Sequence, residues 1–130
     1  MKPYKKEFIK LLVEAEAIKF GEFVLKSGRT APYFLNSGSF YTGDFVTRLG
    51  KAYAEAFLDS GLEADVIFGP AYKGIPLAVT TTSVLYSQFQ KNISYCFNRK
   101  SEKAYGQKDK LIGAPLDGNI KLLLIDDVIT

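Results

Sequence analysis

Three short runs rich in apolar residues constrain the fold of this chain most strongly. They cover residues 66–68, 93–97 and 121–125, each has the length of a strand, and polar or glycine-containing loops follow them directly. In the intervals, apolar residues recur every three or four positions, as in 4–17 and 45–57, which predicts amphipathic helices. Helices that alternate with strands in this order predict an α/β fold with a largely parallel sheet flanked by helices.

Local signals place the ends of several elements. Asp44 is the expected N-cap of the second long helix, and Gly61 is the expected end of that helix. A third helix should begin at about Ile75, because Pro76 is tolerated in a first turn. Upstream, two short strands are expected to flank the turn 26–29, whose sequence is KSGR.

The composition limits the chemistry that the chain can perform. A length of 130 residues predicts one domain, and a net charge of +3 without a long Lys/Arg run favours a small anion over nucleic acid. The sequence has one cysteine and no histidine, which excludes an intrachain disulfide and histidine-dependent catalysis within it. No signal peptide is recognisable, and no apolar run approaches the roughly 20 residues of a membrane span, so we expect a cytoplasmic protein without membrane contact.

The stretch FGPAYKGIP joins a predicted strand to a predicted helix and is typical of a phosphate-binding loop. Gly69 and Gly74 let the backbone approach a ligand, and Lys73 adds a positive charge near the amides that begin the helix. The spacing matches neither the P-loop nor the dinucleotide-binding pattern. The alternative is a glycine-proline turn that carries an exposed lysine.

Other loops allow two interpretations each. Asp126 and Asp127 follow the last strand as two adjacent like charges, which indicates a ligand rich in hydroxyls or cations, or else a solvated strand end. The basic stretch 99–110 is either a solvated loop or a flexible lid that closes over a polyanion. Considered by themselves, Tyr33 and Phe34 are expected in the core.

Taken together, these stretches resemble the orotate phosphoribosyltransferases, which are type I phosphoribosyltransferases of pyrimidine synthesis. The resemblance is carried by KFGEF.LKSGR..PYF.N, FGPAYKGIP, YCFNRK and LIDDVIT, and it extends over nearly all of the chain. It implies the type I phosphoribosyltransferase fold, with N-terminal hood elements in about 1–40 and the core in about 41–130. It also implies transfer of the phosphoribosyl group of 5-phosphoribosyl 1-diphosphate to orotate, which yields orotidine 5'-monophosphate and diphosphate in UMP synthesis.

The resemblance also implies roles for individual residues. The catalytic residues would be Arg99, Lys100 and Lys103. The 5-phosphoribosyl 1-diphosphate site would consist of Lys26, Tyr72, Lys73, Arg99, Lys100, Lys103, Tyr105, Asp126, Asp127, Val128, Ile129 and Thr130. Orotate would be contacted by Phe34, Leu35 and Thr130. Mg²⁺ would be held mainly through the diphosphate, with no direct protein ligand. The family also implies a homodimer with shared active sites and a cis non-proline peptide in the loop at Tyr72.

The sequence departs from the family at three places. Leu35 stands where many members have a second aromatic residue, and Tyr105 stands where the family usually has a loop histidine. The family also continues beyond the position of Thr130, with an arginine that binds orotate. We therefore expect a C-terminally incomplete copy that is inactive by itself. The alternatives are a phosphoribosyltransferase for another base and a non-catalytic sensor or regulator of related fold.

Overall fold

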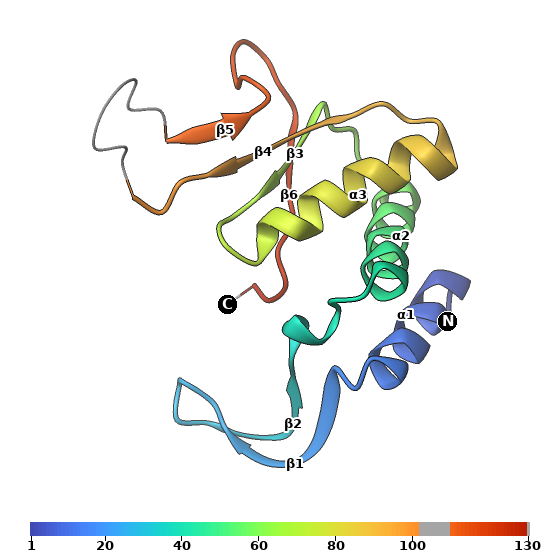
Figure 1. The fold of residues 1–130 in the computed structure, drawn as a ribbon, viewed down its shortest axis with the longest axis vertical. Helices are drawn as coiled ribbons and strands as arrows, with labels where there is room; N and C mark the ends of the chain where they lie inside the picture. Colours follow the sequence, from blue (N-terminus) through green and yellow to red (C-terminus); the bar gives the residue numbers. More distant parts are fainter. Residues whose placement is uncertain (102–109, 130) are drawn as a thin grey trace.

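The computed structural model describes residues 1–101 and 110–129, and Figure 1 shows their arrangement. In chain order the elements are α1 (Pro3–Glu14), β1 (Ile18–Val24), β2 (Thr30–Leu35), the 3₁₀ turn η1 (Ser37–Ser39), α2 (Gly43–Ser60), β3 (Val66–Gly69), α3 (Gly74–Phe89), β4 (Ser94–Asn98), β5 (Leu111–Gly113) and β6 (Leu122–Leu124). The predicted alternation of helices and strands is confirmed.

The main sheet has four strands in the order β5-β4-β3-β6. β3 pairs in parallel with β4 and with β6, so that Phe68 lies between Cys96 and Leu124. The sheet is therefore largely parallel, as the sequence predicts. The short strand β5 was not predicted; it pairs antiparallel with β4, and Ile112 faces Phe97.

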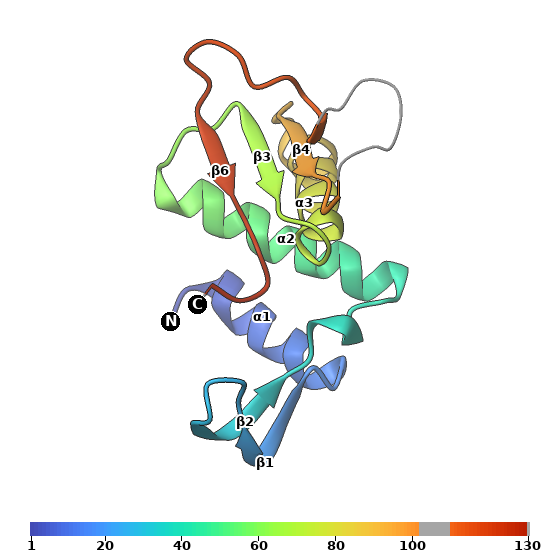
Figure 2. The same cartoon turned by 90° about the vertical axis from the view of Figure 1, so that its left-hand side faces the viewer.

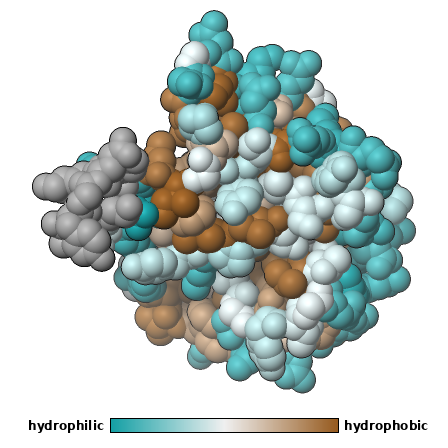
Figure 3. All heavy atoms as spheres, turned by 45° about the horizontal axis from the view of Figure 1, so that its top comes forward, coloured by the Kyte–Doolittle hydropathy of each residue, from teal (hydrophilic) through white to brown (hydrophobic). Residues whose placement is uncertain are grey.

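Two helices cover one face of this sheet, and a third packs outside them (Figure 2). α3 contacts β3 and β4, α2 contacts α3, and α1 contacts α2. The core between them contains Leu49, Phe57, Ile67 and Leu85. On the side shown in Figure 3, apolar patches reach the surface between polar side chains. None of the helices within the described residues is long and apolar enough to cross a lipid bilayer.

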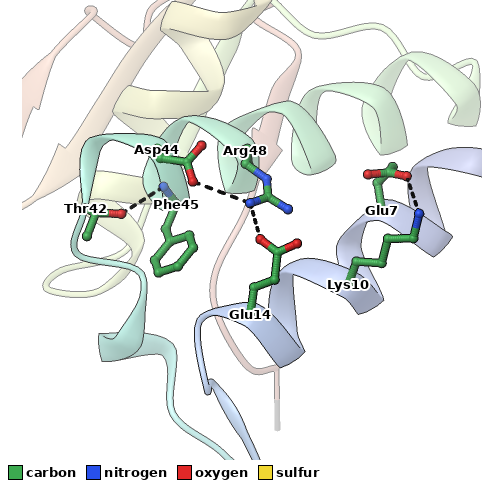
Figure 4. Close-up of polar contacts among 7 residues, drawn as sticks. All are labelled: Glu7, Lys10, Glu14, Thr42, Asp44, Phe45 and Arg48. Atoms are coloured by element: carbon green, nitrogen blue, oxygen red, sulfur yellow. Dashed lines mark hydrogen bonds and ion pairs between the residues drawn. The ribbon is translucent and has the colours of Figure 1, made fainter.

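The start of α2 differs from the prediction that Asp44 is its N-cap. The cap is Thr42, whose hydroxyl accepts a hydrogen bond from the amide of Phe45 at 3.1 Å (Figure 4). Asp44 lies in the first turn instead, 3.5 Å from Nη1 of Arg48. The same nitrogen donates to Glu14 of α1 at 2.5 Å, so Arg48 links the two helices. The predicted end at Gly61 is confirmed, since its φ of 72° is the left-handed conformation that glycine adopts readily.

β1 and β2 form a separate antiparallel hairpin that projects away from the main sheet (Figures 1 and 2). Its turn contains Gly28 at φ 83°, as the KSGR stretch predicts. The expectation that Tyr33 and Phe34 lie in the core is wrong, because they are 47% and 44% exposed. A two-stranded hairpin has no second layer to cover its faces, so its aromatic side chains remain at the surface. Phe34 packs only partly, with its ring 5.7 Å from that of Phe23.

Candidate functional site

The candidate site lies where the parallel strands end. Because β3, β4 and β6 run in the same direction, the segments that follow Gly69, Asn98 and Leu124 leave the sheet at one edge. Ligands of open α/β sheets bind at this edge. Two contacts bring segments from different strands together at this edge. One joins Asn98 to Ala71, and the other joins Lys73 to Asp127.

The loop between β3 and α3 is closed by its two glycines. A Cβ atom built on Gly69 would lie 2.0 Å from the carbonyl oxygen of Gly74, so only glycine fits there. The amide of Gly74 donates to the carbonyl of Pro70 at 2.9 Å, and the Ala71–Tyr72 peptide is cis, as the resemblance implied. The sequence interpretation assigned these glycines to close approach of a ligand. In the structure they let the two ends of the loop touch.

Asn98 fixes this loop from the neighbouring strand. Its side-chain oxygen accepts a hydrogen bond from the amide of Ala71 at 2.7 Å, and both groups are partly buried. The sequence analysis did not single out Asn98. One signal was available in the sequence. Asn98 is a polar residue at the last position of an alternating strand, and the basic stretch that begins at Arg99 follows it directly.

Asp127 connects three segments that are far apart in the sequence. Its Oδ2 accepts from the hydroxyl of Ser37 at 2.8 Å and lies 3.6 Å from Nζ of Lys73. Its Oδ1 accepts from the amide of Val128 at 2.9 Å. Burial raises the pKa of the Asp127 carboxyl, but the hydrogen bonds from Ser37 and Val128 and the charge of Lys73 outweigh it. The pKa therefore lies below its usual value, and the carboxylate is held in its charged form.

Asp126 is held differently, through its backbone and through its neighbour. Its carbonyl accepts a hydrogen bond from the hydroxyl of Tyr53 in α2 at 2.9 Å, and its carboxylate accepts from the amide of Asp127 at 2.9 Å. Burial, together with the charges of Asp127 and Asp126, raises the pKa of Tyr53 to about 12. Ser37 and Tyr53 were both missed by the sequence analysis. Phe34 and Leu35 marked the segment just before Ser37, whereas nothing adjacent to Tyr53 in sequence marks a site.

A pocket of about 190 Å³ adjoins this group of side chains. Ser37, Lys73 and Asp127 form its polar rim, and Phe40 and Leu49 contribute to its apolar wall. Lys73 keeps 68% of its side chain exposed, which leaves its ammonium group accessible to an anion. The arrangement can therefore hold an anionic group at Lys73 and accept hydrogen bonds from hydroxyls at Asp127.

The remaining predicted residues are distributed around this centre. Nζ of Lys100 lies 5.2 Å from the ring centre of Tyr72, and the amide of Arg99 donates to the carbonyl of Lys110 at 2.7 Å. Val128 and Ile129 are exposed directly after the acid pair.

Three of the predicted site residues belong to the hairpin, namely Lys26, Phe34 and Leu35, and all three are exposed. Within the described residues, no hydrogen bond or ion pair joins Lys26 to the strand-end residues. Lys103, Tyr105 and Thr130 lie outside the residues that the structure describes.

Residues 1–101 and 110–129 contain no group of three or more acidic or cysteine side chains placed to hold a metal ion. The carboxylates at the site are Asp126 and Asp127. Both already accept hydrogen bonds from backbone amides.

A protein of known sequence and a protein of known structure that this chain resembles carry the same name. The chain is 54% identical, over 130 residues, to orotate phosphoribosyltransferase of Pseudomonas aeruginosa. Its fold superimposes on the crystal structure of orotate phosphoribosyltransferase of Francisella tularensis with a TM-score of 0.81 and 42% identity, covering 94% of this chain and 56% of that one. The enzyme of Mycobacterium tuberculosis in complex with 5-phospho-α-D-ribosyl 1-diphosphate has the same fold at 15% identity, with a TM-score of 0.60 over 94% of this chain and 63% of that one.

The chain spans about 60% of the length of the curated relatives that it matches. No protein-family model matches the sequence.

Proposed function

We propose that this chain, which belongs by sequence and fold to the orotate phosphoribosyltransferase family, provides the sugar-diphosphate site of an orotate phosphoribosyltransferase. The enzyme would transfer the phosphoribosyl group from 5-phosphoribosyl 1-diphosphate to orotate, a step of UMP synthesis. The observation that carries the proposal is the pair Lys73 and Asp127, whose charged groups lie 3.6 Å apart at the carboxyl edge of the sheet. One supplies a cation for phosphate oxygens, and the other supplies an acceptor for sugar hydroxyls.

The acid pair would bind the ribose. Asp126 and Asp127 accept hydrogen bonds from its 2'- and 3'-hydroxyls, and the backbone amides from Val128 to Thr130 hold the 5'-phosphate. A charged carboxylate is a stronger acceptor than a neutral one, and the lowered pKa of Asp127 keeps it charged at neutral pH. The neutral hydroxyl of Tyr53 holds the same segment by its hydrogen bond to the backbone carbonyl of Asp126.

The cationic groups would bind the diphosphate. Lys73 and Tyr72 approach it from the loop after β3, while Arg99, Lys100 and Lys103 approach it from the segment after β4. Lys26 and Tyr105 add further contacts. When the C1–diphosphate bond breaks, negative charge grows on the leaving group, so cations placed there stabilise the transition state more than the ground state. Mg²⁺, bound through diphosphate oxygens, supplies further neutralisation of that charge.

Orotate would lie between the hairpin and the strand ends, in contact with Phe34, Leu35 and Thr130. The exposure of Phe34 and Leu35, at 44% and 41%, supports this proposal because it leaves both side chains available to a ligand. Residues 1–40 would act as the hood over this site. The segment from Arg99 would reach the site of a second copy, so that the enzyme works as a homodimer with shared sites.

The test uses the full-length protein that carries this chain. Incubation with orotate, 5-phosphoribosyl 1-diphosphate and Mg²⁺ should produce orotidine 5'-monophosphate and diphosphate in equal amounts, measured by chromatography. Lys73→Ala should lose most of this activity, whereas Lys6→Ala on α1 should keep it. Diphosphate-sugar binding without turnover would instead indicate the sensor, and turnover with another base but not with orotate would indicate another phosphoribosyltransferase.

A further inference from the structure

Ser37 lies at the junction between the hairpin and the core. It is the first residue of η1, two positions after Leu35 at the end of β2. Its hydroxyl donates a hydrogen bond to Oδ2 of Asp127, which is 2.8 Å away and 90 residues later in the chain. Among the described residues, this is the only side-chain hydrogen bond that joins 18–39 to 43–129. Beyond the chain itself, this side-chain hydrogen bond therefore links the two parts that the proposed substrates would occupy.

The environment makes this hydrogen bond stronger than an exposed one. Ser37 and Asp127 are both half-buried, and they share the rim of the pocket of about 190 Å³ with Lys73. A hydrogen bond from a hydroxyl to an ionised carboxylate is stronger than one between neutral groups, and partial burial reduces competition from water.

The bond from Ser37 is compatible with a bound sugar. A carboxylate has about four acceptor directions. In Asp127, Val128 uses one of them at Oδ1, and Ser37 and Lys73 approach Oδ2. One direction at Oδ1 remains for a sugar hydroxyl, so Ser37 can keep its hold on Asp127 while the ribose is bound.

We propose that Ser37 is a positioning residue that couples the binding of orotate to the binding of the sugar. A ribose that immobilises Asp127 also immobilises Ser37, and thereby the end of the hairpin with Phe34 and Leu35. By thermodynamic linkage, orotate held by the hairpin strengthens sugar binding by the same factor. This inference rests on the proposed function, because it takes orotate and the phosphoribosyl group as the two ligands.

The test measures coupling with ligands that do not react with each other. Ribose 5-phosphate lacks the diphosphate leaving group, so it can be titrated calorimetrically into the full-length protein with and without saturating orotate. In the wild type, orotate should lower the Kd of ribose 5-phosphate by about 5- to 10-fold. In Ser37→Ala the ratio of the two Kd values should fall to about 1–2, since the link is lost. Ser37→Thr keeps the hydroxyl and should restore most of the ratio.

Ser39→Ala is the matched control, because it changes a serine of the same turn whose side chain makes no hydrogen bond within the described residues. It should keep the wild-type ratio, and equal melting temperatures would show that all variants are folded. A wild-type ratio that persists in Ser37→Ala overturns the coupling and leaves the proposed function intact. A wild type that binds neither ligand overturns both.

Discussion

The hydroxyl of Tyr53, in the middle of α2, donates a hydrogen bond to the backbone carbonyl of Asp126 at 2.9 Å. The two residues are 73 positions apart, and the bond fixes the point where the chain leaves β6. Part of the support for the acid pair therefore comes from a helix that carries none of the proposed ligand contacts.

Removal of this hydroxyl should destabilise the protein in a pH-dependent way. At neutral pH, Tyr53→Phe should lower the free energy of unfolding by about 1 kcal/mol, while Tyr41→Phe, at an 84% exposed side chain, should not. The folded-state pKa of Tyr53, about 12, lies above its ordinary value of 10.0, so its stabilisation is complete below pH 10 and is lost as the pH rises toward 12. Urea denaturation at several pH values should show that the difference in free energy of unfolding between wild type and Tyr53→Phe shrinks between pH 10 and pH 12. A difference that stays constant over this range would contradict the hydrogen bond from Tyr53 to Asp126.

Asn98 should control the shape of the loop after β3. Asn98→Ala leaves the partly buried amide of Ala71 without its acceptor, so it should cost about 1–2 kcal/mol and weaken diphosphate binding by about 5- to 10-fold. Hydrogen exchange at the amide of Ala71 should accelerate in the same variant. Asn98→Asp keeps an acceptor oxygen, so it should restore the protection of that amide, yet its negative charge should still weaken diphosphate binding. The exposed Asn92 provides the control, and Asn92→Ala should change neither quantity.

Two neighbouring threonines of α3 should respond in opposite directions to the same substitution. Thr81 is 0% exposed, and its hydroxyl has no hydrogen-bond partner among residues 1–101 and 110–129. Thr81→Val should therefore raise the free energy of unfolding by about 1 kcal/mol. Thr80 donates to the carbonyl of Val46 in α2 at 2.9 Å, so Thr80→Val should lower it by a similar amount. Urea denaturation of the two variants checks both signs. A loss of stability in both would mean that the Thr81 hydroxyl is satisfied in solution.

The lysines proposed at the diphosphate should differ in kinetic effect. Lys73 lies on a loop that Asn98 already holds in place, so Lys73→Ala should weaken binding of the sugar diphosphate visibly. Lys103→Ala should leave affinity almost unchanged and lower kcat by about 10²- to 10³-fold, if the lysine meets the diphosphate mainly in the transition state. Steady-state kinetics of the full-length protein separates the two effects. A near-normal kcat in Lys103→Ala would favour the alternative interpretation, in which the basic stretch 99–110 is a solvated loop without a catalytic role.

Shared sites can be tested by mixing two inactive subunits. Lys103→Ala and Asp127→Asn each remove one half of a proposed site, and a hybrid dimer of the two regains one site with both wild-type groups if those groups come from different subunits. Activity should then return in part when verified heterodimers are assayed. Self-contained sites predict no recovery, because each subunit of the hybrid still lacks one group.

Local sequence determined the elements and the class of the site. Apolar periods placed α1 and α2, continuous apolar runs placed the parallel strands, and Pro76 placed the start of α3. The glycine-lysine loop and the acid pair were recognised because each is continuous in sequence. Such signals arise within one turn or one strand, so they can be recognised from neighbouring residues without knowing how the rest of the chain folds. The N-cap shows the limit, because Thr42 and Asp44 are both good caps and only the backbone path into α2 decided between them.

Tertiary structure alone decided which side chains support that site. Ser37, Tyr53 and Asn98 reach their partners across 90, 73 and 27 residues, and nothing in their own neighbourhoods predicts those hydrogen bonds. β5 likewise exists only because β4 offers it an edge, and Tyr33 and Phe34 are exposed because the hairpin lacks a covering layer. Propensity acts between neighbours in the chain, whereas a hydrogen bond or a covered face depends on which distant segments the fold brings together.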